Sequence, residues 1–221
     1  MKKIYLLFLL ATVSYSTAFG QVEGTWKLAP VAQALAVGPT EGDFGWWSNT
    51  EADITTRACL FDDEYVFNAD GSFENVVGDQ TWIETWQGAA AEGCATPVAP
   101  HDGSAIATWS FDESTSEVTI EGAGAYLGLA KVHNNGELTN PTDAVASISY
   151  PVAFSNDGMT MTIDINFGGG FWHFVFNKEA AQETGSVDGT WKLAPVAQAL
   201  AVGPTEGDFG WWSNTEADIT T

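Results

Sequence analysis

The chain has 221 residues, of which seven are basic and 29 are acidic, and its formal net charge is −22 at neutral pH. Such a charge repels polyanions, so it argues against nucleic acid, anionic membranes and sulfated or uronic polymers as partners. We interpret the acidity mainly as a means of keeping an exported protein soluble.

The first 20 residues have the pattern of a secretory signal peptide. Lys2 and Lys3 provide the positive start, residues 4–13 form an apolar stretch, and residues 18–20 make a small-x-small cleavage site before Gln21. The apolar stretch is too short to span a bilayer, and no cysteine follows the cleavage site to carry a lipid anchor. We therefore expect the protein to be secreted, extracellular or at the cell surface, without insertion into a membrane.

The next part of the chain has the pattern of short strands with one helix. The turn Ala69-Asp70-Gly71 predicts a hairpin between strands at 64–68 and 72–77. Ser48 and Glu51 have the spacing of a capping box, which predicts a short helix or turn over residues 48–56. Two further strands are expected, over residues 24–29 and 81–87.

The clearest strands lie in the second half of the chain. From Met159 to Phe167, apolar and polar residues alternate strictly, which predicts a strand with one buried face and one wet face. A similar stripe runs from Ile148 to Phe154, and a turn at 156–158 joins the two strands into a hairpin. The other expected strands are a hairpin of 105–112 with 117–122, and single strands at 126–130 and 170–178.

The end of the chain repeats its beginning. Residues 187–221 have the sequence of residues 22–56 with one change, from Glu23 to Asp188. An offset of 165 residues is too long for a solenoid repeat and is typical of whole domains in tandem, although a wrongly assembled gene could give the same pattern. We expect a complete module over 21–186, a truncated second copy over 187–221, a longer parent protein, and neighbouring modules as partners.

Eight or nine short antiparallel strands in one module predict an all-β fold, either a barrel or a β-sandwich. Cys59 and Cys94 are the two cysteines, and in an oxidising compartment we expect them to form a disulfide rather than to hold a metal. Besides the two stripes around residues 148–154 and 159–167, the expected core contains Trp26, Leu28, Tyr65, Phe67, Phe73, Trp109, Phe111, Val118 and Ile120.

The chain resembles the bacterial lipocalin-like domains. A Gly24-Thr25-Trp26 start opens the first strand, and a strand ending in Asn177-Lys178 closes the module. Residues 42–73, TWIETWQG at 81–88, APHDGS at 99–104 and GGGFW at 168–172 resemble modules appended to secreted polysaccharide-degrading and adhesive proteins. The resemblance implies a lipocalin-like β-barrel of about eight strands with an accessory, non-catalytic, glycan-associated role.

Tryptophan is the residue type that suggests a ligand, because indole faces stack on the apolar faces of sugar rings. In a strand, Trp82, Glu84 and Trp86 share one face, and in a helix the two tryptophans still align. An exposed aromatic platform is one interpretation of this trio. A buried position for both indoles is the other.

Two further tryptophan segments are candidates. Trp46 and Trp47 lie in a glycine-rich loop, where one indole can anchor in the core and the other meet a ligand, or both can plug the end of the barrel. In the strand at 170–178 we expect one face to meet the core. The other face, with Trp172, Phe174 and Phe176, is expected to lie under the Ala-rich N-terminal segment or to be open to a ligand.

Acidic clusters raise the hypotheses of calcium binding and glycoside hydrolysis. Asp62, Asp63 and Asp70 are weak candidates for Ca²⁺ ligands, since the turn chemistry already explains Asp70. Glu84 could face Asp62 or Glu64 across a cleft, but no sequence motif ties these carboxylates together. We therefore expect no enzyme activity, no cofactor and no metal.

These observations predict a secreted accessory module that binds a neutral polysaccharide or another glycan without cleaving it. One alternative is a lipocalin-like carrier of a small apolar ligand, and another is a structural repeat of an adhesin. The position of the aromatic side chains distinguishes them, since a glycan needs them at a surface and a carrier needs them around a cavity.

Overall fold

The computed structural model describes residues 18–180, 201–202, 212–213 and 215. The chain divides into two compact units, Met1–Ala181 and Gln182–Thr221. The basic start and the apolar stretch of the expected signal peptide lie outside the described residues. In the part that is described, no helix is both long and apolar enough to cross a membrane.

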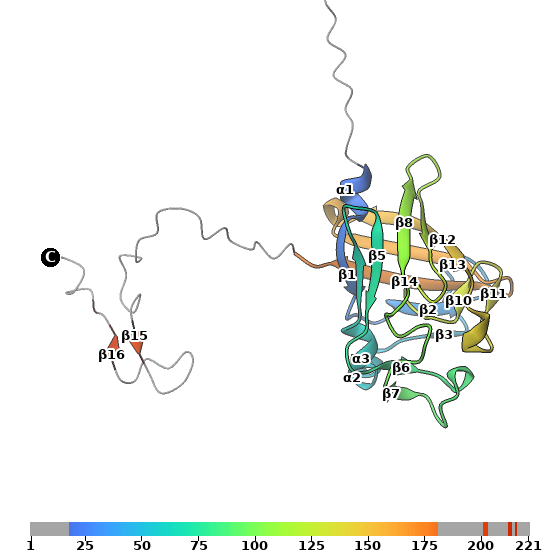
Figure 1. The fold of residues 1–221 in the computed structure, drawn as a ribbon, viewed down its shortest axis with the longest axis horizontal. Coiled ribbons are helices and arrows are strands. Elements are labelled where there is room, and N and C mark those ends of the chain that lie inside the picture. Colours follow the sequence, from blue (N-terminus) through green and yellow to red (C-terminus); the bar gives the residue numbers. More distant parts are fainter. Residues whose placement is uncertain (1–17, 181–200, 203–211, 214, 216–221) are drawn as a thin grey trace, which may run out of the picture. The chain divides into compact units, whose positions relative to one another are not determined.

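The first unit is an antiparallel β-barrel (Figure 1). Each strand pairs with the next, and β1 also pairs with β14, so the sheet closes on itself. This closure confirms the barrel and rules out the sandwich alternative, which would need two separate sheets. The eight strands of the barrel are β1 (Gly24–Leu28), β4 (Glu64–Phe67), β5 (Ser72–Val76), β8 (Ala107–Asp112), β9 (Glu117–Glu121), β12 (Ser147–Ser155), β13 (Thr160–Asn166) and β14 (Phe171–Lys178).

The three predicted hairpins are confirmed as β4–β5, β8–β9 and β12–β13. In β13, Met161, Ile163 and Ile165 are buried as the alternation predicted. Met159 is a correction, because it lies before β13 and is 38% exposed. The short 3₁₀ turn η3 (Asn156–Gly158) precedes Met159, whose N–H donates to the carbonyl of Asn156 in that turn instead of to a neighbouring strand.

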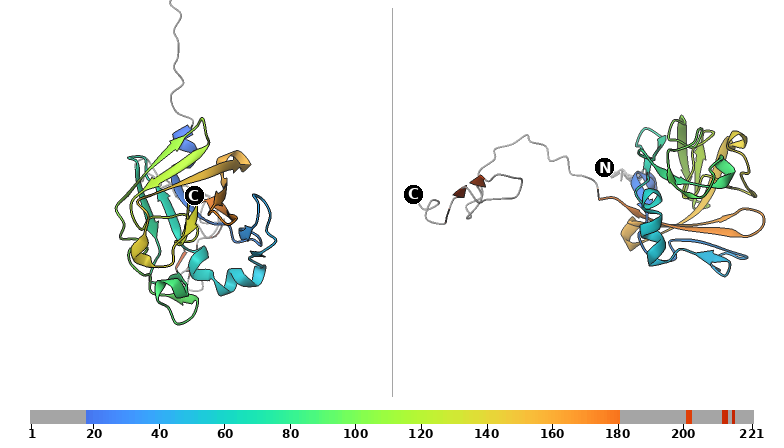
Figure 2. Two further views of the ribbon diagram at one scale, coloured as in Figure 1. Left: turned by 90° about the vertical axis from the view of Figure 1, so that its right-hand side faces the viewer. Right: turned by 90° about the horizontal axis from the view of Figure 1, so that it is seen from below.

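Several short strands were not predicted. β2 (Leu35–Gly38) pairs with the first half of β14, and β3 (Trp47–Ser48) pairs with β2, so they extend the sheet beyond the closed barrel (Figure 2). Two small ribbons, β6 (Thr81–Ile83) with β7 (Gly93–Ala95) and β10 (Val132–His133) with β11 (Gly136–Glu137), lie outside the main sheet.

The predicted helix is present but starts later than its expected cap. α2 (Glu51–Thr56) begins after Thr50, whose side chain forms the capping box with Asp53. Ser48 cannot act as the cap because it belongs to β3, where it pairs with Ala36. The other helical segments are α1 (Ala18–Val22), α3 (Ala58–Phe61), η1 (Thr85–Gln87) and η2 (Pro141–Asp143).

Two strand predictions are wrong in part or in full. The strand expected at 81–87 ends at Ile83 and continues as η1. The segment 126–130 forms no strand, because backbone groups of residues 126 and 127 are hydrogen-bonded to side chains instead of to a neighbouring strand. Asn75 bonds both the N–H and the carbonyl of Tyr126, and the Tyr150 hydroxyl accepts from the Leu127 N–H.

Aromatic side chains fill the barrel. At one end, the Trp26 indole donates to the carbonyl of Val22 (2.7 Å), and Lys178 Nζ lies 5.4 Å from the ring centroid. Phe111 and Phe154 of the predicted core are only partly buried. The largest fully buried side chains are Trp26, Tyr65, Tyr150, Phe67, Phe73, Phe174 and Phe176.

The core face of β14 corrects the sequence prediction. Trp172, Phe174 and Phe176 point into the barrel, because β14 pairs with β13 so that Phe174 is opposite Ile163 and Trp172 is opposite Ile165. The Ala-rich segment does not cover this face. It runs beside β14 as β2.

Candidate functional site

Trp46 is the most exposed of the six predicted site residues, with 54% of its surface accessible. Its backbone N–H donates to the carbonyl of Val37 (3.2 Å). Its indole ring packs edge-on against the Phe167 ring, with 6.5 Å between centroids. A Cβ on Gly170 would lie 2.6 Å from the indole, so glycine lets the ring lie against the start of β14. The indole is therefore held at the tip of the β13–β14 hairpin.

Trp47 and Trp172 lie on one face of three adjacent strands. Trp172 on β14 pairs with Val37 on β2, and Val37 pairs with Trp47 on β3. Cross-strand partners point to the same side of a sheet, and two strand spacings amount to about 10 Å. Trp172 is 8% exposed, whereas Trp47 is only partly buried against the core.

Arg57 lies between two of the predicted tryptophans. Its guanidinium carbon is 5.1 Å from the ring centroid of Trp47 and 4.0 Å from that of Trp82. Each such cation–π contact stabilises by about 0.5–1 kcal/mol at an exposed site. The residue occupies the junction where α2 ends and α3 begins, so its backbone position is set by both helices.

The predicted disulfide is present and holds this arrangement. Cys59 on α3 is bonded to Cys94 on β7. Cys94 is the cross-strand partner of Trp82 in the β6–β7 ribbon, and Cys59 follows Arg57 by two positions. The covalent bond therefore links the segment that carries Arg57 to the ribbon that carries Trp82.

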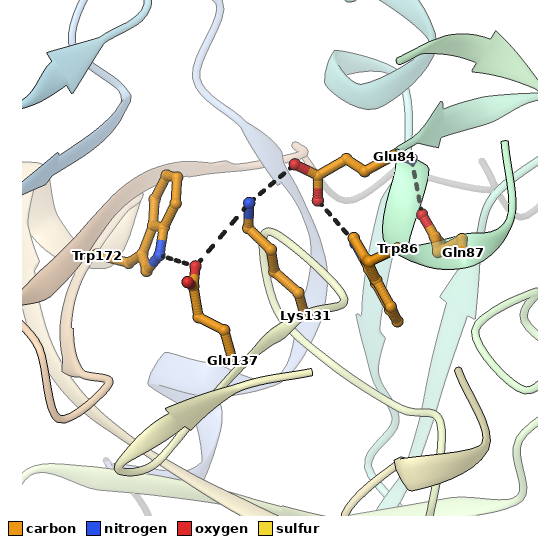
Figure 3. A network of polar contacts seen from close by, with 6 residues as sticks. All are labelled: Glu84, Trp86, Gln87, Lys131, Glu137 and Trp172. Atoms are coloured by element: carbon orange, nitrogen blue, oxygen red, sulfur yellow. Dashed lines mark hydrogen bonds and ion pairs between the residues drawn. The ribbon is translucent and has the colours of Figure 1, made fainter. Parts of the chain in front are cut away.

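A polar network connects the remaining predicted residues (Figure 3). Lys131 Nζ lies 2.8 Å from Glu84 Oε1 and 3.9 Å from Glu137 Oε1. The Trp86 indole donates to Glu84 Oε2 (3.0 Å), and the Trp172 indole donates to Glu137 Oε1 (2.8 Å). Lys131 Nζ is also 5.1 Å from the centroid of the Trp172 ring. Each carboxylate thus binds one cation and one indole.

All six predicted residues gather at one end of the barrel. The register of β14 places Trp172 six residues from Lys178, which is opposite Trp26, so this end lies about 20 Å from the Trp26 end. We call it the tryptophan end. It is formed by Trp46, Trp47, Trp82, Glu84, Trp86 and Trp172, together with Arg57, Lys131 and Glu137.

Three of these residues were not predicted. Arg57, Lys131 and Glu137 come from three different segments, and only the fold brings them to the tryptophans. One sequence signal was available for Arg57, because it is the only arginine of a very acidic chain. No such signal distinguishes Glu137 from the other acidic residues.

Two of the three calcium candidates, Asp63 and Asp70, are engaged in other contacts. Asp63 is buried, accepts from Thr81 Oγ1 (2.6 Å), and burial raises the pKa of its carboxyl to about 8, so it is protonated at neutral pH. Asp70 accepts from the Ser72 N–H and hydroxyl in the β4–β5 turn. Within the described residues, no three metal-ligating side chains are grouped to hold an ion.

The carboxylates proposed as catalytic partners line different hollows. Asp62 and Glu64 line an open cleft of about 540 Å³ beside the disulfide. Glu84 instead lines a void of about 10 Å³ between Trp82, Trp86 and the segment 128–130. Since Glu84 is also paired with Lys131, neither Asp62 nor Glu64 forms a facing carboxylate pair with it.

His173 is satisfied within the barrel wall. Its Nδ1 lies 2.8 Å from Asp164 Oδ1 on the neighbouring strand, and the Phe44 ring packs against it with 4.6 Å between centroids.

Comparisons of the chain with protein-family models, with curated proteins and with solved structures find no significant match. The function of the tryptophan end is therefore inferred from its own geometry.

Proposed function

We propose that this chain is an exported, non-catalytic module that binds a neutral polysaccharide at the tryptophan end. The observation that carries the proposal is the convergence of four tryptophans, from β3, β6, η1 and β14, around Glu84, Lys131, Glu137 and Arg57, with the exposed Trp46 at the same end of the barrel. Flat apolar faces bordered by hydrogen-bonding groups are what a sugar ring needs, because its two faces are apolar and its rim is polar.

Exposure supports a surface role for part of this group. Trp46 is exposed, and Trp47, Trp82 and Trp86 are partly exposed, whereas Trp172 is buried beneath Lys131. A ligand can thus reach Trp46, Trp47 and Trp86, while Trp82 lies under Arg57 and Trp172 anchors the polar network from below. Indoles held by such contacts, a hydrogen bond for Trp86 and ring contacts for Trp46 and Trp47, lose little side-chain entropy when a ligand binds.

Charge supports an uncharged ligand. The two carboxylates of the tryptophan end are balanced by Lys131 and Arg57, whereas the whole chain has a net charge of −22. A sulfated or uronic polymer would therefore be repelled by the net charge of the chain rather than by the site itself.

The carrier alternative has less support, because bulky aromatic side chains occupy the interior of the barrel where an apolar ligand would lie. Hydrolysis also has less support, since Glu84 is held by a lysine and an indole rather than opposite a second carboxylate.

Affinity electrophoresis of the purified chain tests the proposal. Native gels would contain a neutral β-1,3- or β-1,4-glucan, or, as matched anionic gels, a pectate or a sulfated glucan. We expect slower migration in at least one neutral gel and no retardation in the anionic gels. Equal migration in all gels would contradict the proposal.

A further inference from the structure

Arg57 is the only arginine of a chain that has 29 acidic residues, and among the described residues no carboxylate forms an ion pair with it. Its charge acts on Asp53 only as a minor influence on the pKa of that carboxyl. Within the described part of the chain, its guanidinium forms neither an ion pair nor a hydrogen bond, and its contacts are the rings of Trp47 and Trp82. The five N–H donors of this side chain are therefore unused by the fold.

The missing ion pair has a local cause. Asp53 lies four residues before Arg57, which is the spacing for an ion pair along a helix. Its carboxylate is instead committed to the capping box, where it accepts from the Thr50 N–H and the Thr50 hydroxyl, both at 2.7 Å. These hydrogen bonds also lower the pKa of Asp53, so the carboxylate stays ionised and bound to Thr50.

The guanidinium is nevertheless fixed in place. It is stacked on Trp82 at 4.0 Å, and the disulfide joins Cys59, two residues after Arg57, to Cys94, the strand partner of Trp82. The two rings position the planar guanidinium before a ligand binds, and the disulfide holds the two segments together. The side chain therefore loses little conformational entropy on binding. Stacking also covers one face of Trp82, so this indole serves as a support for Arg57 rather than as an open platform.

We infer that Arg57 is the residue that recognises the ligand at the tryptophan end, where its fork donates to two neighbouring hydroxyl oxygens of a neutral sugar. This inference rests on the proposed function. A guanidinium presents two parallel N–H groups, which match two acceptor oxygens side by side. A carboxylate has the same spacing, but the net charge of −22 disfavours its approach.

Two substitutions and a control test the role of Arg57. Arg57→Met removes the donors and the charge, whereas Arg57→Lys keeps a cation over the indoles but removes the planar fork. Lys27→Met removes one positive charge from the barrel wall, where Lys27 pairs with Glu64 at 3.0 Å. Calorimetric titration with cellohexaose and laminarihexaose gives the affinity of each full-length variant, and thermal melting reports whether it is folded.

The unaltered chain should bind at least one of the two hexasaccharides. We expect Arg57→Met and Arg57→Lys to weaken that binding by about tenfold or more, and Lys27→Met to change it by less than about twofold. Unchanged affinity of a folded Arg57→Lys variant would overturn the inference about Arg57 alone. Failure of the unaltered chain to bind any neutral glucan would overturn the proposed function, and this inference with it.

Discussion

Asp63 is the buried carboxyl that connects the barrel wall to the ribbon carrying Trp82. It is 1% exposed, accepts a hydrogen bond from Thr81 at the start of β6, and its other oxygen has no partner among the described residues. Burial disfavours the ionised form and raises the pKa of the carboxyl to about 8. The folded chain therefore holds a proton on this carboxyl that the unfolded chain releases near pH 4.

This difference predicts a pH dependence of stability. Because the folded pKa is raised, the stabilisation is complete below about pH 4 and is lost as the pH rises to about 8, at about 1.4 kcal/mol per pH unit. Asp63→Asn mimics the protonated carboxyl, so it should remove the part of the pH dependence of the free energy of unfolding that Asp63 causes.

Urea unfolding between pH 5 and pH 8 measures the free energy of unfolding of each variant. Asp70→Asn is the control, since hydrogen bonds from Ser72 lower the pKa of that exposed carboxyl and it does not titrate in this range. An equal slope in Asp63→Asn and the unaltered chain would contradict the prediction.

The indoles of Trp86 and Trp172 each donate to a glutamate of the polar network. Their replacement should nevertheless have different effects, on ligand affinity for Trp86 and on stability for Trp172. Trp86 is partly exposed, so Trp86→Ala should weaken glucan binding by about five- to tenfold with a small change in melting temperature. Trp172 is buried in the barrel, so Trp172→Ala should lower the free energy of unfolding by about 3–5 kcal/mol. Calorimetric titration and chemical unfolding measure the two effects. If Trp86→Ala destabilised the chain as much as Trp172→Ala does, Trp86 would be a core residue.

At the scale of elements, the disulfide fixes a small ribbon rather than the barrel. β6 and β7 pair only with each other in the described sheets, whereas the barrel strands form a closed ladder. The Cys59–Cys94 bond joins this ribbon to α3 across a sequence separation of 35. The ribbon and the Arg57 junction therefore depend on the bond more than the barrel does.

Replacing both cysteines should test this division. In the Cys59→Ser, Cys94→Ser double variant, the free energy of unfolding should fall by about 3–4 kcal/mol on the chain-entropy estimate. The β-barrel signal in circular dichroism should persist below the melting temperature, while glucan binding should weaken because Trp82 and Arg57 are no longer held together. Full glucan affinity in the double variant would show that the bond does not organise the site.

The elements that could be predicted are those whose pattern is local. The alternation in β12 and β13 and the turn at 156–158 gave the correct hairpin, because period-two burial and turn chemistry are visible in neighbouring residues. β2 and β3 escaped prediction because they are short and distant in sequence from β14, on which β2 depends. The helix start was misplaced because two overlapping cap patterns compete, and pairing of Ser48 with Ala36 decides between them.

The candidate residues could be selected from the sequence one by one, but their spatial arrangement could not be predicted. Each of Trp46, Trp47, Trp82, Glu84, Trp86 and Trp172 was identified from its type and spacing. Their convergence depends on long-range register, such as Trp172 with Val37 and Val37 with Trp47, and on the disulfide. Lys131 and Glu137 could not be predicted, since nothing near them in sequence distinguishes them from other charged surface residues.

At the scale of the whole molecule, the repeated segment keeps part of its local structure. β15 (Ala201–Val202) pairs with β16 (Trp212–Ser213), and their register is that of β2 with β3 shifted by 165 residues. The repeated sequence therefore forms the same strand pairing in both copies. The barrel is closed by β1 and β14 within residues 24–178, so the repeat is not required for its closure.

Deleting residues 187–221 should leave the melting temperature of the barrel nearly unchanged. It should also remove any oligomers whose amount depends on protein concentration, because the near-copy of residues 22–56 can exchange with that segment in a second molecule. Calorimetry and light scattering at several concentrations measure the two effects. A large fall in melting temperature on deletion would show that the repeat is an integral part of the barrel.

The central claim is that a neutral glycan binds at the tryptophan end and nowhere else on the barrel. Indole N–H resonances provide the test, because Trp26 and Trp109 serve as internal references at the other end of the barrel, where their indoles donate to the carbonyls of Val22 and Asn68. In a titration with a neutral β-glucan hexasaccharide, we expect shifts for Trp46, Trp47, Trp82 and Trp86, and none for Trp26 or Trp109. No shift for any indole at saturating ligand, or equal shifts for Trp26 and Trp46, would contradict it.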